Sequence, residues 1–144
     1  MPKELLFKIF EDLKNVLKLL ESSVQEYAPF DPKKKYTAIE LKTYDALSFR
    51  FEKTVELYFN FFRALEQFLF KDESDTLRNR LLKMQKIELI GELERWMLIR
   101  DLRNKIAHAY APDELLKIYT AILNDYKILT SVMEKIESYL KGLK

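Results

Sequence analysis

Apolar residues recur at helical spacing through the first part of the chain. Steps of three and four residues place side chains on one face of an α-helix. The residues that show this spacing are Phe7, Phe10, Leu13, Leu17 and Leu20. The pattern predicts a helix from about Pro2 to Tyr27. Pro29, Asp31 and Pro32 then interrupt it, and the three lysines at 33–35 are expected in a solvated loop.

A longer helix is predicted from about Thr37 to Lys71. Thr37 and Glu40 have the spacing of a capping box, in which side chains bond the first free backbone N–H groups. Two apolar stripes follow, one of Phe51, Val55, Tyr58, Phe62, Leu65 and Leu69, the other of Leu57, Phe61, Ala64 and Phe68. Two stripes need two burial partners. The helix is therefore either central in a bundle, or it turns one stripe towards a second subunit.

Three further helices are expected after the polar segment 72–75. A short one begins at Ser74 or Asp75 and ends near Gly91, a residue suited to a left-handed cap. The next runs from about Glu92 to Tyr110.

Pro112 ends that helix, because its ring would clash with the carbonyl of His108. The last helix runs from Pro112 to about Leu140, and Asp113 and Glu114 suit its positive end.

Composition supports the same fold. The chain has 144 residues, 48% of them hydrophobic, which fits a single domain over residues 1–144 with a substantial core. It has only 2 Gly and 4 Pro, whereas sheet proteins use many turns rich in these residues. Short connections between long helices predict an all-α, up-and-down bundle of four or five helices.

Several function classes are disfavoured by composition. Without cysteine there is no disulfide, zinc-thiolate site or thiol nucleophile, which fits a reducing cytoplasm. No apolar run is long enough to span a membrane, and the first ten residues do not resemble a signal peptide. The net charge of +2 does not by itself indicate a nucleic-acid-binding protein. No cofactor-binding loop or metal-ligand spacing is present, so neither cofactor nor metal is expected.

The chain contains a single histidine, His108, at the end of the fourth predicted helix. Asn104 lies four positions before it and shares its helix face. Arg103 and Tyr110 are seven apart and nearly eclipse each other if the helix continues that far. A purely structural interpretation is open, because basic residues at a helix C-terminus are stabilised by the helix dipole.

The same residues suit cleavage of an RNA phosphodiester by its 2′-hydroxyl. His108 can donate a proton, Arg103 presents a fork that fits phosphate oxygens, and Asn104 can orient either group. A single imidazole does not readily serve as both acid and base. A two-fold dimer would supply a second copy. We therefore expect a homodimer in which two His108 and two Arg103 side chains line one cleft, with the second stripe of the long helix at the interface.

Residues 103–110 match the R-x4-H-x-Y motif of HEPN domains of the HepT type, also known as the nucleotidyltransferase substrate-binding family. The resemblance extends to Arg50-Phe51-Glu52 with Glu56-Leu57, to Trp96, and to the break at Ser74. It covers roughly residues 45–116. Ala111-Pro112 departs from the acidic continuation that is frequent in this family.

The resemblance implies a two-fold dimer that acts as a toxin, a metal-independent endoribonuclease with Arg103 and His108 as catalytic residues and Asn104 beside them. It also implies an antitoxin partner, a minimal nucleotidyltransferase that transfers AMP to Tyr110. The alternative is a binding subunit that presents a substrate to such a partner without cleaving RNA. Candidates for contact with an RNA backbone, or for an ordinary solvated face, are Arg78, Arg80, Lys83, Lys86, Arg95 and Arg100.

Overall fold

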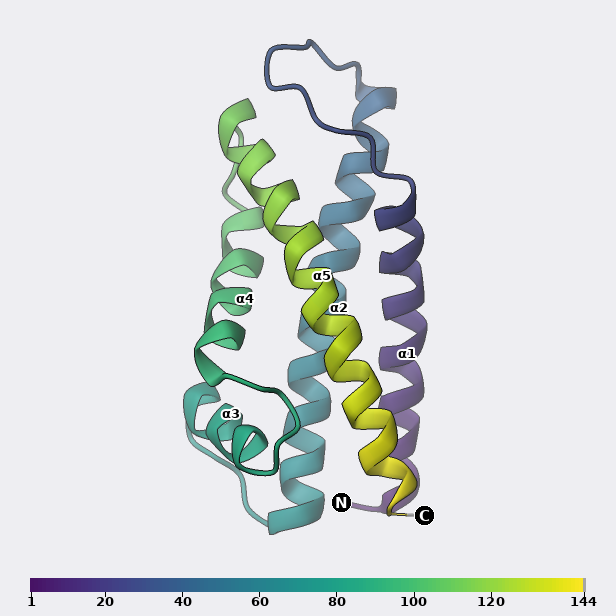
Figure 1. Ribbon diagram of the computed structural model, residues 1–144, viewed down its shortest axis with the longest axis vertical. Helices are drawn as coiled ribbons and strands as arrows, with labels where there is room; N and C mark the ends of the chain where they lie inside the picture. The colour runs from purple at the N-terminus through teal and green to yellow at the C-terminus, as the bar shows by residue number, and fades with distance from the viewer. Residues whose placement is uncertain (144) are drawn as a thin grey trace.

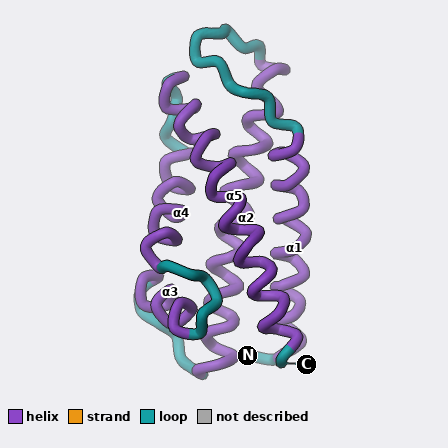
Figure 2. Tube along the Cα trace, in the orientation of Figure 1, coloured by secondary structure: helices purple, strands orange, loops and turns teal. Residues whose placement is uncertain are grey.

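The computed structural model describes residues 1–143, and within them it contains five α-helices and no strand (Figures 1 and 2). The helices are α1 (Lys3–Gln25), α2 (Ala38–Phe70), α3 (Leu77–Lys86), α4 (Leu93–Ile106) and α5 (Pro112–Lys141). The all-α prediction is confirmed. No helix in this part of the chain is long and apolar enough to cross a membrane.

The four longer helices alternate in direction, as an up-and-down bundle requires (Figure 1). α1 rises from the N-terminus, α2 returns beside it, α4 rises again, and α5 descends obliquely towards the N-terminal end. The short α3 lies at the end of the bundle where α2 finishes. As a result, the turn from α4 into α5, which holds residues 107–111, lies at the opposite end from both termini.

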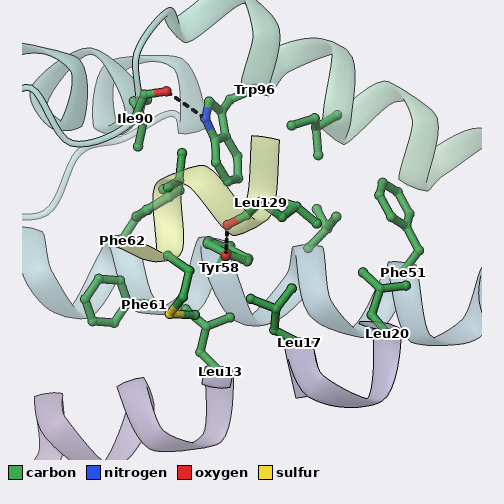
Figure 3. Packing of buried hydrophobic residues seen from close by; sticks show 14 of the residues in the cluster. Leu13, Leu17, Leu20, Phe51, Tyr58, Phe61, Phe62, Ile90, Trp96 and Leu129 are labelled. Atoms are coloured by element: carbon green, nitrogen blue, oxygen red, sulfur yellow. Dashed lines mark hydrogen bonds between the residues drawn. The ribbon is translucent and has the colours of Figure 1, made fainter. Parts of the chain in front are cut away.

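The core is centred on α2, which contacts each of the other four helices. Its residues Phe51, Tyr58 and Phe62 are fully buried, and the indole of Trp96 packs over Tyr58 and Phe62 (Figure 3). The polar groups of Tyr58 and Trp96 are both satisfied. The Tyr58 hydroxyl donates to the carbonyl of Leu129, and Trp96 Nε1 donates to the carbonyl of Ile90 at 3.1 Å.

The second apolar stripe of α2 lies inside the protomer. Phe61 and Ala64 are buried, and the Phe61 ring lies 6.0 Å from that of Phe10 on α1. Leu57 and Phe68 also pack against the core. The interpretation of this stripe as a subunit interface is therefore wrong, and the alternative of a central bundle helix is confirmed. α1 already covers the face on which a dimer was expected.

Local chemistry fixed some helix starts as predicted. Thr37 and Glu40 form the capping box at the start of α2, and Pro112 is the first residue of α5. α3 begins later than the predicted Ser74 or Asp75, because Thr76 caps it by accepting from the Asn79 backbone N–H at 3.1 Å. Gly91 has the expected positive φ of 74°, but α3 already ends at Lys86.

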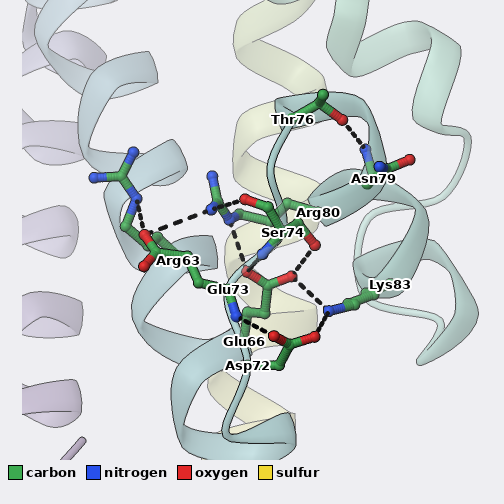
Figure 4. Close-up of polar contacts among 9 residues, drawn as sticks. All are labelled: Arg63, Glu66, Asp72, Glu73, Ser74, Thr76, Asn79, Arg80 and Lys83. Carbon is green, nitrogen blue, oxygen red and sulfur yellow. Dashed lines mark hydrogen bonds and ion pairs between the residues drawn. The ribbon is translucent and has the colours of Figure 1, made fainter.

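A buried carboxylate explains why Ser74 does not cap α3. Glu66 on α2 is fully buried and accepts hydrogen bonds from the backbone and hydroxyl of Ser74, and from Arg80 Nε at 3.0 Å (Figure 4). The Lys83 ammonium nitrogen lies 3.0 Å from Oε2 of Glu66. Burial works to raise the pKa of Glu66, but the hydrogen bonds from Ser74, Lys83 and Arg80 outweigh it and hold the pKa at about 2. This ionised group anchors α3 and the preceding loop to α2.

Candidate functional site

The predicted site residues lie at the end of α4 and in the turn that leads into α5. α4 ends at Ile106, four residues earlier than the predicted Tyr110. Ala107 is its C-cap, and the His108 backbone N–H bonds the Lys105 carbonyl at 3.0 Å in a final turn. Ala111, which precedes Pro112, is extended with a ψ of 137°, because a residue before proline is disfavoured in the helical region.

Arg103 is the part of the motif that remains on the helix. Its side chain is half-buried, and its guanidinium carbon lies 5.6 Å from the centroid of the Phe59 ring on α2. Its Nη2 donates to Oδ1 of Asn104 at 3.4 Å. The aromatic face and the amide hold the guanidinium in place without neutralising it.

Most arginines of the described residues pair with a carboxylate, and Arg103 does not. The ion pairs are Arg63–Glu73, Arg78–Glu94, Arg80–Glu66, Arg95–Asp125 and Arg100–Asp101. Arg50 also lacks an ion pair, but its Nη1 donates to the Leu19 carbonyl and to the Ser23 hydroxyl. Within residues 1–143, Arg103 is therefore the guanidinium left most available to an external anion.

Arg103 opens into a cleft of about 420 Å³ between α2, the 73–77 segment and α4. Arg63 and Arg80 also line this cleft, together with Glu56 and Glu73. Glu73 lies 3.7 Å from Arg63 and 4.0 Å from Arg80, so these two guanidiniums are already compensated.

His108 lies in a different hollow. Its side chain is exposed beyond the end of α4, and it lines a pocket of about 460 Å³ together with Asn104 and the first turns of α5. The predicted proximity of Asn104 and His108 is retained, although His108 is no longer on the helix. Asn104 thus connects the two hollows, since it also bonds Arg103.

Tyr110 does not stack over Arg103, because the helix that would have aligned them ends first. Its side chain is instead 82% exposed in the turn before α5. A phenol in this position is open to an approaching protein.

Two acidic residues on α2, Glu52 and Glu56, lie near Arg103 and are not among the predicted site residues. Partial burial raises the pKa of Glu52, and the positive charge of Arg103 opposes that rise. Glu52 and Glu56 are one turn apart on α2, on the side of Phe59. Their four-residue spacing was a signal in the sequence, but only the position of α4 shows that they face Arg103.

The basic residues considered for RNA contact mostly have structural partners. Arg78, Arg80, Arg95 and Arg100 form the ion pairs given above, and Lys83 pairs with Glu66. Lys86 has no ion pair within the described part of the chain. Across the same residues no group of three or more histidine, aspartate or glutamate side chains could hold a metal ion.

Comparison with known proteins gives one family. The model of the family described as "Nucleotidyltransferase substrate binding protein like" matches residues 8–141, which is nearly the whole chain. No curated protein matches the chain.

Proposed function

The chain belongs to the nucleotidyltransferase substrate binding protein-like family, as its 103–110 motif predicted, and from that premise we propose that it is a metal-independent endoribonuclease. In this proposal it is the toxin of a toxin–antitoxin pair and acts as a homodimer. Arg103 and His108 are the catalytic residues, and Asn104 positions them.

The observation that carries this proposal is the state of Arg103. Its guanidinium has no carboxylate partner within the described chain, it is supported by Phe59 and Asn104, and it faces an open cleft. Glu52 and Glu56 lie on the same side, but neither forms an ion pair with Arg103 in the described chain, so the N–H donors of Arg103 remain open to an external anion. A phosphodiester suits these donors, because a guanidinium can bond two of its oxygens at once.

Cleavage needs two proton transfers. The His108 imidazole of one protomer takes the proton of the RNA 2′-hydroxyl while the 2′-oxygen attacks phosphorus. The P–O5′ bond breaks, and the partner subunit's His108 gives a proton to the leaving 5′-oxygen. Arg103 stabilises the negative charge that develops on the phosphoryl oxygens. The products are a 2′,3′-cyclic phosphate and a free 5′-hydroxyl.

With the second stripe of α2 already buried, a different face has to form the dimer. Phe49 is 66% exposed, an unusual position for a phenylalanine, and it lies one turn before Glu52 on α2. The same side carries Glu56, which lines the cleft of Arg103, and Arg100 lies one turn before Arg103 on α4. A two-fold axis here would pack two Phe49 rings together and bring acidic residues of one protomer to basic residues of its partner.

The test uses RNA cleavage and growth arrest as readouts. Arg103→Ala and His108→Ala should each abolish both, and circular dichroism should show the helical content of the parent. Lys8→Ala, which removes an exposed positive charge from α1, is the control and should keep activity. If either variant cleaves RNA at the rate of the parent, the substituted residue is not catalytic.

A second candidate function rests on Tyr110. Its phenol is 82% exposed, which suits a nucleotide acceptor for a partner nucleotidyltransferase. In that reaction the phenol oxygen attacks the α-phosphorus of ATP, pyrophosphate leaves, and AMP remains on Tyr110. Such a charged group would hinder RNA from reaching Arg103, so it could inactivate the toxin.

The same acceptor would serve a subunit that cleaves no RNA and only presents Tyr110 to the enzyme. Intact-mass measurement after incubation with a partner minimal nucleotidyltransferase and ATP should show nucleotidyl additions that Tyr110→Phe lacks. If Arg103→Ala is modified normally while the parent never cleaves RNA, the binding-subunit function is the correct one.

A further inference from the structure

The pocket beside His108 has the size and lining of a nucleobase site. Its volume is about 460 Å³, whereas small-molecule sites usually measure roughly 300 to 1,000 Å³. Ile118, which is only 6% exposed, and Ala109 supply an apolar surface from α5 and the interhelix turn. A flat heterocycle that lies against this surface would be shielded from water on one side.

The rim of the pocket carries charges that are not used within the chain. Lys105 comes from α4, and Glu114 and Lys117 come from the first turns of α5. In the part of the chain that the structure describes, none of these three side chains forms an ion pair or a side-chain hydrogen bond with another residue. One carboxylate and two ammonium groups therefore remain available to a ligand.

This combination matches the chemistry of a nucleotide. The ammonium groups suit a phosphate, and a carboxylate accepts hydrogen bonds only, so it selects a base edge that donates. Guanine presents two neighbouring donors, N1–H and N2–H2, which the two oxygens of one carboxylate can accept together. The Watson–Crick edges of adenine, cytosine and uracil each offer a donor at a single position.

We propose that this pocket binds a guanine nucleotide, with the base against Ile118, its Watson–Crick edge on Glu114, and a phosphate on Lys105 and Lys117. Because Asn104 and His108 line the same pocket, this nucleotide lies next to the scissile bond. The inference deepens the proposed function by naming guanine as the base that the nuclease selects. That the bound nucleotide belongs to RNA rests on the proposed function, whereas the proposal that the pocket binds a guanine nucleotide does not depend on it.

Binding is tested first, without any cleavage. Backbone amide NMR spectra of the protein are recorded during titration with guanosine, adenosine, cytidine and uridine 5′-monophosphates at millimolar concentration. The guanine nucleotide should bind most tightly and shift signals from residues 104–118. The proposal is overturned if no nucleotide shifts these signals, if all four bind equally, or if the shifts fall instead around Arg63 and Arg80.

Variants separate the role of each rim group. Glu114→Gln replaces one acceptor oxygen by a donor and should weaken guanosine monophosphate binding about tenfold, which is roughly 1.4 kcal/mol, with little effect on uridine monophosphate. Lys117→Ala should weaken all four nucleotides alike. Glu134→Gln, which removes an exposed carboxylate from the distant part of α5, should change nothing. Unchanged guanine preference in Glu114→Gln would overturn the assignment.

RNA then distinguishes the source of the nucleotide. A short single-stranded RNA with one guanosine should be cut beside that base by the parent, and Glu114→Gln should lose this preference. Guanine-specific binding that Glu114→Gln weakens, without RNA cleavage, would support the pocket and contradict the proposed nuclease. Cleavage without preference for guanine would support the nuclease and contradict the pocket.

Discussion

Arg103 and His108 lie five positions apart in the sequence, yet within one chain they line two different hollows. Asn104 lines the hollow of His108 and accepts a hydrogen bond from Arg103. Arg103 is still on α4, which ends at Ile106, whereas His108 lies in the turn beyond it. A site that uses both groups on one phosphate therefore depends on how a second protomer is placed.

Mixing the parent with His108→Ala tests this shared site. Cleavage needs one imidazole from each protomer, so a mixed dimer, which holds a single intact His108, should be inactive. We expect RNA cleavage to fall as the square of the parent's fraction after the two proteins are mixed and exchange subunits. Native mass spectrometry checks that mixed dimers form. A fall in direct proportion to the parent's fraction would show that each chain cleaves RNA by itself.

Phe49 provides a test of the dimer face. Phe49→Asp places a charge in the proposed interface and should convert the dimer to a monomer, because an unpaired buried charge costs several kcal/mol. Light scattering after size-exclusion chromatography measures the mass. Leu5→Asp, at another exposed apolar position on α1, should remain dimeric. If Phe49→Asp forms a dimer with the same affinity as the parent, Phe49 is not in the interface.

The buried carboxylate of Glu66 should matter more for stability than any surface ion pair. Glu66→Gln leaves Arg80 and Lys83 without their anionic partner, and we expect a loss on the order of 3 kcal/mol in the free energy of unfolding near neutral pH. Urea denaturation measures it. The exposed pair of Lys8 and Asp12 gives the control, since Asp12→Asn should cost less than about 1 kcal/mol.

The contribution of Glu66 should also depend on pH. Because folding lowers its pKa from 4.5 to about 2, its stabilisation is complete above pH 4.5 and is lost as the pH falls towards 2. The difference in unfolding free energy between the parent and Glu66→Gln should therefore shrink over this interval. If the difference stays constant between these pH values, Glu66 stabilises the protein through packing and not through its charge.

The hydroxyl of Tyr58 offers a smaller and cleaner test of the core. Tyr58→Phe removes the bond to the Leu129 carbonyl and keeps the ring, so the free energy of unfolding should fall by about 1 kcal/mol. Thermal unfolding followed by circular dichroism is sufficient. Tyr139→Phe, whose ring is only partly buried, should leave the midpoint unchanged. Equal effects of the two substitutions would argue against a role for the hydrogen bond.

The sequence determined the features that depend on neighbours along the chain. Helical spacing gave the long elements, the Thr37–Glu40 capping box marked the start of α2, and Pro112 marked the start of α5. Residues 103–110, together with Trp96 and the pattern of residues 50–57, indicated the family. All of these are local signals, because capping, proline geometry and residue spacing act within one or two helical turns.

Tertiary structure decided which surfaces meet. It assigned both stripes of α2 to the protomer's own core, buried Glu66 against α3, and placed His108 in a turn beyond the end of α4. None of these follows from spacing, because an apolar or charged side chain shows the same periodicity whichever element covers it. Burial and ion pairing depend on residues distant in sequence, so the position of the site in space could be read only from the fold.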